Sequence, residues 1–551
     1  MSTNISKQKR EDLIYKIEEI RKYLKNNLYD ENAQKLMGYL NELTTQINGQ
    51  KYGLVFEEHR EKIDETLEDH LPVLTEEKDL FVGNGGEMNF LLEGDNLASL
   101  QLLGKTHKGK IDVIYIDPPY NTGNKDFIYD DDFVNTEDSF RHSKWCSFIT
   151  KRLEIARHLL SDKGAIFISI DDNEYAALKI ICDDIFGTSK YIATTIWQNS
   201  IQPKGYLGSI SMQHNYTLIY SKNDNWEIGS LERTEKHNKA YKNPDNDPRG
   251  LWRSGDVRNA LYRPNLIYDI ISPSGKKIAP PSANGWRWSK ETVEEKIRTG
   301  EIIFNKDETG IIRKIYLDTV GGRAPESIWF GDDVGTTRIA TTELKDIFGG
   351  KSPFDTPKPT SLIKRILYLS TNKSATILDF FAGSGTTGHA VLKLNSEDGG
   401  KRKFILCTNN ENGICRDITY QRLKTVITGE RKDGSKYSDG LPGSLKYFKV
   451  DFVPVAEKEY YEYADKLLLH VRELVELENA VDFEHNNSVA IVLTEDEMTE
   501  FEKVISTSST TTRTLYLGHD VLLSKEQKNL LTENGIEVKI IPQYYYPELN
   551  G

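Results

Sequence analysis

The residues of this chain best suited to chemistry are Asp117, Pro118, Pro119 and Tyr120, which stand in a row. Asp117 accepts hydrogen bonds, the prolyl carbonyls accept them without a competing N–H on the same residue, and Tyr120 offers an aromatic face. Acceptors hold an exocyclic amine while an aromatic ring stacks on a flat base, so the four residues suit a flat ring that carries an amino group. The alternative is a strand followed by a proline turn with no chemical role.

The segment before these residues explains how they would be positioned. Residues 111–116 read Ile-Asp-Val-Ile-Tyr-Ile, an apolar and β-branched run typical of a buried strand in a parallel sheet. Two prolines then end the strand, because neither has an N–H to donate to a sheet ladder. The corner therefore lies at the carboxyl end of a strand, where open α/β sheets bind their ligands.

A second feature of the same kind stands at 374–388. Residues 374–379 predict a strand that ends in Asp379, the sequence Phe-Phe-Ala-Gly-Ser-Gly-Thr-Thr-Gly follows, and residues 388–394 suit a helix. Gly383 and Gly385 permit a tight turn and the close approach of backbone to a ligand. A glycine turn between a strand and a helix is the setting of nucleotide-like cofactor sites, and two phenylalanines before it are unusual for an NAD loop. The turn therefore favours S-adenosylmethionine over NAD as the cofactor.

These two motifs resemble those of the DNA amino-methyltransferases, which have the patterns D-x-F-x-G-x-G for the cofactor and D/N/S-P-P-Y/F for catalysis. Here they read "DFFAGSG" (379–385) and "DPPY" (117–120), with the catalytic motif about 260 residues ahead, an order that resembles the β class. Aspartate in the first position is the usual form for adenine N6 methylation. Other segments resemble the modification (Mod) subunit of Type III restriction–modification systems: "LLEGDNLASLQLL" (91–103), "DPPYNTGNKDFIYDD" (117–131), "DSFRHSKW" (138–145), "KGAIFISIDDNE" (163–174) and "YFKVDF" (447–452).

The resemblance implies roles for individual residues. Asp117 and the Pro118 carbonyl would accept hydrogen bonds from the adenine amine, and Tyr120 would stack on the base. An acid after residues 404–407 would bind ribose hydroxyls, and Glu411 is the nearest, although Asn409 and Asn410 stand where many relatives place it. The expected catalytic residues are thus Asp117, Pro118, Pro119 and Tyr120, and the expected cofactor-binding residues are Asp379, Phe381, Gly383, Gly385, Thr386, Asp95, Lys358 and Glu411.

The resemblance also implies partners. The substrate would be double-stranded DNA from which one adenine is flipped out, since the base cannot reach an active site inside the duplex. The chain would form a homodimer and bind a separately encoded helicase–nuclease restriction subunit. The chain itself has no Walker-type G-x-x-x-x-G-K-[ST] sequence and no nuclease signature.

Composition limits the class of protein. The chain has 551 residues with 38% hydrophobic and 28% charged residues, which fits a globular protein of two to four domains. We see no signal peptide and no run of 18 apolar residues, so we expect no membrane span and a cytoplasmic location in a prokaryotic cell. The four cysteines form no C-x-x-C pair, so we expect neither a metal site nor disulfides.

Charge is unevenly distributed. The net charge of −13 argues against a protein that coats DNA generally, but residues 201–330 carry 20 Lys/Arg against 16 Asp/Glu. Basic residues and aromatic residues alternate most densely at 253–290, a pattern expected where phosphates and unstacked bases are bound. It equally fits an ordinary mixed surface with buried tryptophans. The candidate DNA contacts are Arg253, Arg258, Arg263, Lys276, Lys277 and Arg287.

Strand and helix periods alternate over most of the chain, which indicates a doubly wound α/β fold. With the resemblance, this predicts a Rossmann-like methyltransferase core interrupted by a target-recognition domain. The N-terminal helix would place Leu13, Ile17, Ile20 and Leu24 on one face, and residues 457–479 would form one long helix. The expected divisions are a helical N-terminal segment (1–80), a catalytic half (81–200), the target-recognition domain (201–345), a cofactor-binding half (346–440) and a small α/β interaction domain (441–551).

The sequence therefore predicts an S-adenosylmethionine-dependent methyltransferase of adenine N6 in a specific DNA sequence, as the modification subunit of a Type III system. An orphan or Type II-like adenine or cytosine-N4 methyltransferase remains an alternative. An RNA or protein-amine methyltransferase is disfavoured by Asp117 and by the block at 201–345. A non-catalytic DNA-recognition subunit is disfavoured by the intact motifs.

Overall fold

The structure is a computed structural model, and it describes residues 14–22, 24, 36, 40 and 56–546, except 124–126, 130–131, 135–137, 204–209, 456–465, 484–487 and 508–510. The chain forms two compact units, which we call the main unit (Met1–Trp226 with Ser327–Gly551) and the inserted unit (Glu227–Glu326).

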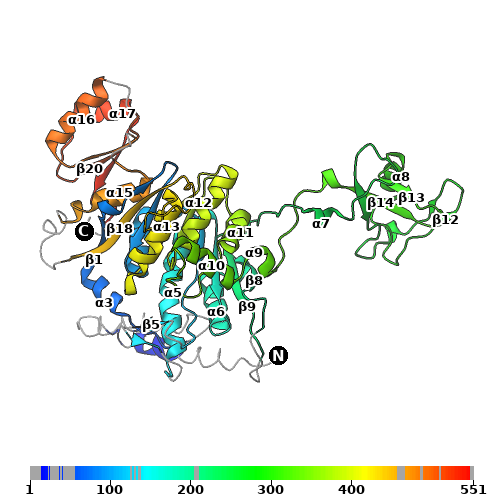
Figure 1. Cartoon of the computed structure of the whole chain (residues 1–551), viewed down its shortest axis with the longest axis horizontal. Helices are drawn as coiled ribbons and strands as arrows, with labels where there is room; N and C mark the ends of the chain where they lie inside the picture. Colours follow the sequence, from blue (N-terminus) through cyan, green and yellow to red (C-terminus); the bar gives the residue numbers. More distant parts are fainter. Residues whose placement is uncertain are drawn as a thin grey trace. The chain divides into compact units, whose positions relative to one another are not determined.

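One large mixed sheet organises the main unit. Its strand order is β1-β18-β3-β17-β16-β4-β7-β9-β8-β15, with β2 paired to β18. Figure 1 labels β1, β18, β8 and β9 of this sheet. From β18 to β7 all neighbours are parallel, whereas β9 is antiparallel to both β7 and β8. The strands are β1 (His70–Glu76), β2 (Val82–Gly83), β3 (Met88–Glu93), β4 (Ile111–Ile116), β7 (Leu160–Ile170), β8 (Tyr191–Gln198), β9 (His214–Ser221), β15 (Ile328–Trp329), β16 (Thr376–Asp379), β17 (Lys403–Thr408) and β18 (Ser444–Pro454).

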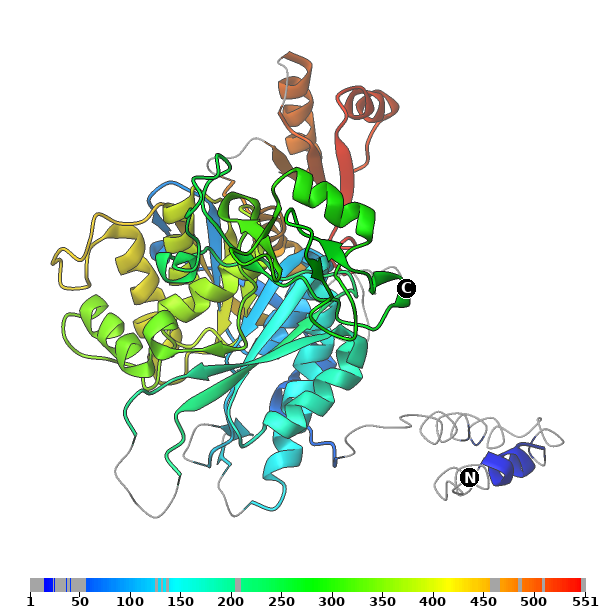
Figure 2. The same cartoon turned by 90° about the vertical axis from the view of Figure 1, so that its right-hand side faces the viewer.

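Helices cover both faces of this sheet. The helices α4 (Asn96–Thr106), α5 (Arg141–Leu159) and α6 (Tyr175–Phe186) pack on one another in turn, and so do α11 (Thr360–Ser370), α12 (Thr386–Asp398) and α13 (Tyr420–Thr428). Figure 2 shows the sheet between the cyan helices of the first group and the yellow-green helices of the second. Two covered faces explain why β4 and β17 are apolar along most of their length. The predicted mixed α/β fold is confirmed.

Local sequence sets several element ends. The predicted strand at 111–116 agrees with the structure. The helix α6 ends at Gly187, whose φ is 96°. Asp95 caps α4, because its Oδ1 accepts from the backbone N–H of Leu97 (2.7 Å) and Ala98 (3.3 Å).

The ends of the main unit differ from the expected divisions. Both β1 and β18 belong to the main sheet, so it extends beyond residues 81–440 on either side. Ile17 and Leu24 are buried with Leu40, but Ile20 is 49% exposed, so the predicted four-residue face is wrong at Ile20, and Leu13 lies outside the described residues. The helix predicted at 457–479 is interrupted by a turn at Leu469 and His470, after which α15 spans Val471–Asn479. Residues 456–465 lie outside the described residues.

The last part of the main unit is a small α/β layer. Its three strands β19 (Val489–Val492), β20 (Thr514–Gly518) and β21 (Glu537–Ile541) form a parallel sheet, accompanied by α16 (Glu495–Thr507) and α17 (Lys525–Glu533).

The inserted unit has its own core. It contains an antiparallel sheet of β10 (Trp252–Gly255), β14 (Ile311–Tyr316) and β13 (Ile302–Phe304), the paired strands β11 (Ile270–Ile271) and β12 (Lys277–Ile278), and the helix α8 (Lys290–Arg298). Figure 1 labels β12, β13, β14 and α8. Trp286, Val293 and Ile302 are among the buried residues of the unit. This unit is shorter than the expected 201–345, because β9, β15, α9 (Gly331–Val334) and α10 (Thr337–Ile347) belong to the main unit.

Candidate active site

The two sequence motifs meet at one edge of the main sheet. Strands β4 and β16 are parallel neighbours, with Val113 paired to Ile377 and Ile114 to Leu378. Asp117 follows the carboxyl end of β4, and Asp379 is the last residue of β16. The carboxyl ends of parallel strands share an edge, so the proline corner and the glycine turn lie beside each other.

Three charged or polar side chains interact at the corner. Asp117 Oδ1 accepts a hydrogen bond of 2.8 Å from the Tyr120 hydroxyl, and Asp117 Oδ2 forms an ion pair with Lys358 Nζ. The Lys358 ammonium also lies 5.1 Å from the centre of the Tyr120 ring. Burial raises the pKa of Tyr120 well above its ordinary value, and the Asp117 carboxylate raises it further, so the phenol stays protonated and donates.

Pro119 has a structural partner that the sequence motif does not reveal. The buried Trp145 on α5 donates from Nε1 to the Pro119 carbonyl at 2.7 Å. The indole therefore anchors the corner to α5.

Asp379 is buried and fully engaged. Its Oδ1 accepts from the Phe381 N–H at 3.0 Å and its Oδ2 from the Thr387 hydroxyl at 2.5 Å. Burial raises the pKa of Asp379 to about 7, and the nearby Asp117 carboxylate acts in the same direction. A carboxylic group that titrates near neutrality therefore lies next to the corner.

Backbone conformation explains the two glycines of the turn. Gly383 has φ 48° and Gly385 has φ 74°, both in the left-handed region that favours glycine. A Cβ at Gly383 would lie 3.2 Å from the Phe354 ring, and one at Gly385 would lie 3.1 Å from Cγ2 of Thr419. The Thr419 hydroxyl also donates to the Gly383 carbonyl at 2.5 Å, which fixes the turn against the start of α13.

A buried arginine joins the turn to the segment that carries Lys358. Arg422 Nη1 donates to the Thr386 hydroxyl oxygen at 2.7 Å and to the Ser384 carbonyl at 3.3 Å. The Thr386 hydroxyl in turn donates to the Lys358 carbonyl at 3.2 Å. The sequence pattern did not identify Arg422, because nothing in a helical pattern distinguishes a buried arginine from an exposed one.

The remaining predicted cofactor residues lie along the same edge. Asp95 follows β3 and Glu411 follows β17, and these two strands are parallel neighbours. Asp95 Oδ2 is 3.7 Å from Nη2 of the buried Arg152, and Glu411 is exposed. The Phe381 ring packs 5.7 Å from the ring of Phe148.

The predicted DNA contacts lie on the inserted unit and differ in their environment. Arg258 is ion-paired with Asp256, Arg253 donates to the Tyr241 hydroxyl at 3.0 Å, and Lys276 donates to the Asp307 carbonyl at 2.9 Å. Arg287 lies 5.8 Å from the Trp288 ring centre, while Arg263 and Lys277 are exposed. Trp252 and Trp286 are buried, so these two rings are not available to stack on bases, whereas Tyr262 is 63% exposed.

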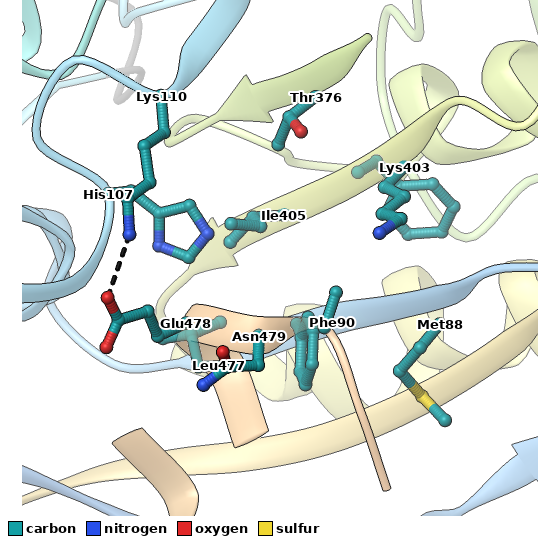
Figure 3. A pocket seen from close by; sticks show the side chains of 12 residues that line it. Met88, Phe90, His107, Lys110, Thr376, Lys403, Ile405, Leu477, Glu478 and Asn479 are labelled. Carbon is teal, nitrogen blue, oxygen red and sulfur yellow. Dashed lines mark hydrogen bonds and ion pairs between the residues drawn. The ribbon is translucent and has the colours of Figure 1, made fainter. Parts of the chain in front are cut away.

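A cavity of about 110 Å³ lies at the opposite edge of the main sheet (Figure 3). Its lining includes Thr376 and Lys403, the first residues of β16 and β17, together with His107, Lys110 and Glu478. None of the predicted site residues lines this cavity. It is separate from the candidate active site.

Membrane spans and metal sites are both absent from the described part of the chain. There, no helix is long and apolar enough to cross a membrane, and no cluster of three or more His, Cys, Asp or Glu side chains has the arrangement of a metal site.

Comparison with known proteins defines the family. Residues 111–420, more than half of the chain, match the N6/N4 DNA methylases. The chain therefore belongs to the N6/N4 DNA methylase family.

Several curated proteins are similar to this chain. The StyLTI Mod subunit of a Type III restriction-modification enzyme from Salmonella typhimurium is 36% identical over 62% of this chain and 56% of that protein. The Type II methyltransferase M.KpnI from Klebsiella pneumoniae is 37% identical over 65% of this chain and 90% of that protein. The EcoP15I Mod subunit from Escherichia coli is 30% identical over 65% of this chain and 66% of that protein. The chain thus spans little more than half the length of the StyLTI Mod subunit.

Solved structures show a weaker likeness. The cytosine-N4-specific PvuII DNA methyltransferase matches with a TM-score of 0.32 and 11% identity over 60% of this chain and 86% of that one. TTHA0409 from Thermus thermophilus, whose structure is described as a putative DNA modification methylase complexed with S-adenosylmethionine, matches with a TM-score of 0.31 and 13% identity over 61% of this chain and 95% of that one. Both scores are too low to define the function of this chain.

Proposed function

We propose that the chain transfers a methyl group from S-adenosylmethionine to the N6 amine of adenine in a specific duplex DNA sequence, as the modification subunit of a Type III restriction–modification system. The observation that carries the proposal is the juxtaposition of the Asp117–Tyr120 corner with the Asp379 turn on adjacent parallel strands. One part suits an amino-bearing base and the other suits a cofactor.

The strand order supports a doubly wound core with its ligands at this point. In the sheet, β17 lies on one side of β16, whereas β4 and then β7 lie on its other side. Ligands of open α/β sheets bind where the strand order changes direction in this way, outside the carboxyl ends. The candidate site lies at that switch point between β16 and β4.

The residues at the turn fit S-adenosylmethionine. Burial raises the pKa of Asp379 to about 7, so a cation beside it would stabilise the ionised carboxylate. The amino group of the cofactor supplies such a cation. Gly383 and Gly385 would allow the methionine end to approach the backbone, and Asp95 and Glu411 would lie toward the adenosine end, since both follow neighbouring strands.

The corner residues would then activate the base. Asp117 and the Pro118 carbonyl would accept hydrogen bonds from the N6 amine and stabilise positive charge that develops on that nitrogen. Tyr120 would stack on the flipped adenine, and Trp145 would hold the corner rigid through Pro119. When bound, the cofactor supplies an activated methyl group, so the protein contributes mainly positioning and electrostatics.

The inserted unit would read the DNA sequence. It carries 18 Lys/Arg against 15 Asp/Glu, although the whole chain has a net charge of −13. Leu261 and Tyr262 are 68% and 63% exposed on a loop that is held in place by two side-chain hydrogen bonds, from Asn259 to the Leu261 carbonyl (2.6 Å) and from Asn284 to the Ala260 carbonyl (3.0 Å). An exposed apolar and aromatic pair on an anchored loop near Arg263 suits contact with base steps in a groove.

A second candidate function is a Type II-like methyltransferase that acts without a restriction subunit. The lengths of the relatives favour it, because the match covers 90% of M.KpnI but only 56% of the StyLTI Mod subunit. Homodimer formation and a helicase–nuclease partner both belong to the Type III proposal. Affinity purification of the full chain from its own host separates the two functions: an associated helicase–nuclease supports Type III, and a chain that purifies alone supports the alternative.

The enzymatic proposal is tested with the full chain, methyl-labelled S-adenosylmethionine and mixed-sequence duplex DNA. After digestion to nucleosides, mass spectrometry should find the label in N6-methyl-2′-deoxyadenosine from the DNA and none in nucleosides from a matched RNA. Label in N4-methylcytosine would favour the cytosine alternative, and label only in RNA would overturn the proposal.

A further inference from the structure

The residue after the catalytic corner is held in an unusual way. Asn121 is fully buried and has φ 58°, a left-handed conformation that asparagine tolerates better than most residues. Its Nδ2 donates to the Arg141 carbonyl at 3.2 Å and to Glu174 Oε1 at 2.6 Å. The amide therefore ties the corner after β4 to two other elements, α5 and the start of α6.

Glu174 is the centre of this contact. Its side chain has no solvent exposure, and its Oε1 also lies 2.6 Å from Nδ1 of His142. His142 Nε2 lies 3.2 Å from Nη2 of Arg141, and arginine can only donate, so His142 Nε2 accepts and the proton of the neutral ring lies on Nδ1. We assign this tautomer from the hydrogen bonds. Oε1 of Glu174 therefore accepts two hydrogen bonds.

The second side-chain oxygen of Glu174 and the amide oxygen of Asn121 have no hydrogen-bond partner among the described residues. These two atoms, Glu174 Oε2 and Asn121 Oδ1, are both buried. If Glu174 were ionised, both atoms would be acceptors, and two unsatisfied buried acceptors are costly. A proton on Oε2 converts one of them into a donor, and an amide and a carboxylic acid then complement each other with one donor and one acceptor apiece.

The surroundings favour the protonated form. Burial raises the pKa of Glu174 above its ordinary value, although the hydrogen bond from Asn121 and the nearby His142 and Arg141 act in the opposite direction. The titratable and charged groups that interact with Glu174, namely Arg141, His142 and Cys146, all lie on α5. The corner after β4 contributes only the neutral Asn121.

We propose that Glu174 is a neutral carboxylic acid in the folded protein, that its Oε2 proton is shared with Asn121 Oδ1 directly or through one water, and that this pair positions the Asp117–Tyr120 corner. Glu174 follows the end of β7, the parallel neighbour of β4. Trp145 fixes the same corner through Pro119. Asn121 and Glu174 are thus positioning residues, and this part of the inference rests on the proposed methyl transfer, whereas the protonation state does not.

Glu174→Gln tests the protonation state, because glutamine keeps one acceptor and one donor and cannot ionise. An acid whose pKa is raised in the folded protein contributes stability that is lost as pH rises from its unfolded toward its folded pKa. The thermal midpoint of Glu174→Gln relative to wild type should therefore increase as pH rises above the ordinary pKa of a glutamate. The exposed Glu65→Gln is the matched control and should show no such trend. A Glu174→Gln midpoint as low as that of Glu174→Ala at every pH would overturn the neutral acid.

Catalytic constants test the positioning role. Asn121→Gly keeps the left-handed backbone accessible and removes only the amide, so it should lower kcat for DNA methylation by about 10- to 100-fold with unchanged affinity for S-adenosylmethionine. Glu174→Ala, which removes both carboxyl oxygens, should also lower kcat, and Glu174→Gln, which keeps one donor and one acceptor, should retain more activity than Glu174→Ala. Equal kcat in wild type and Asn121→Gly would overturn the positioning role. If wild type itself methylates no DNA, the proposed function fails, while the thermal midpoints still decide the state of Glu174.

Discussion

Lys358 Nζ forms an ion pair with Asp117 Oδ2, although 241 positions separate the two residues in the chain. The pair is largely buried, with 10% and 26% of the two side chains exposed. The carbonyl of the same Lys358 accepts from Thr386 in the glycine turn. A continuous set of contacts therefore runs from the Asp117–Tyr120 corner to the glycine turn.

The ion pair predicts a role for Lys358 that differs from cofactor binding alone. Lys358→Met should lower kcat at least about tenfold while the affinity for S-adenosylmethionine changes little, because the lysine orients Asp117 through a charge-assisted contact. Lys358→Arg, which keeps the charge, serves as the matched variant and should retain more activity. Steady-state kinetics and calorimetry separate the two effects. Unchanged kcat with weakened cofactor binding would assign Lys358 to the cofactor instead.

The glycine turn predicts a steric effect at Gly385. Gly385→Val should abolish binding of S-adenosylmethionine measured by calorimetry, because a Cβ there meets Thr419 and the φ of 74° strains any other residue. Gly399→Val is the control, since Gly399 has φ 67° but nothing within 4 Å of an added Cβ. It should cost stability of about 1 kcal/mol and leave binding intact. Normal cofactor affinity in a folded Gly385→Val protein would contradict the assignment of the turn.

The raised pKa of Asp379 predicts a pH dependence of cofactor binding. Burial raises this pKa to about 7, and only the ionised form pairs with the amino group of the cofactor. Affinity for S-adenosylmethionine should therefore fall as pH is lowered from about 8 to about 6. The stability of the free protein should change with pH in the opposite direction. Asp379 stabilises the fold most at low pH, and this contribution is lost as pH rises from about 4 to about 7. Calorimetry on wild type and Asp379→Asn checks both trends, and an equal pH slope in the two proteins would contradict them.

The inserted unit predicts that sequence recognition is separable from chemistry. Replacing residues 227–326 by the corresponding unit of a relative should change the methylated DNA motif and leave the modified base unchanged. The narrower boundaries preserve β9 and β15 in the main sheet, whereas a swap of 201–345 would remove both strands. A swapped chain that is folded and still methylates the original motif would place recognition elsewhere.

The sequence predicts the structural features whose signal lies in neighbouring residues of the chain. The β-branched run 111–116 forms a strand with the expected ends. The glycine turn was placed correctly after β16, because its glycines and the preceding apolar run are neighbours in the chain.

Contacts between residues that lie far apart in the sequence cannot be predicted from local sequence patterns. Neither the Lys358–Asp117 pair nor the Trp145 contact with Pro119 has a local signal, since each depends on how the sheet brings separate segments together. The inserted unit ends before residue 345, because the two-residue strand β15 pairs with β8, which is more than a hundred positions away in the chain. Ile20 follows a helical pattern and yet is exposed, which shows that periodicity alone does not identify what a face packs against.

The most direct test of the account is single-molecule sequencing of DNA from a host that expresses the full chain or its Asp117→Ala variant. The wild-type chain should place N6-methyladenine within one recurring sequence motif. Asp117→Ala should leave that motif unmodified, because the acceptor for the amine is lost, and Asp117→Asn should modify it much more slowly since an amide still accepts one hydrogen bond. Methylation of the same motif by Asp117→Ala at the wild-type level, or no N6-methyladenine from the wild-type chain, would contradict the account.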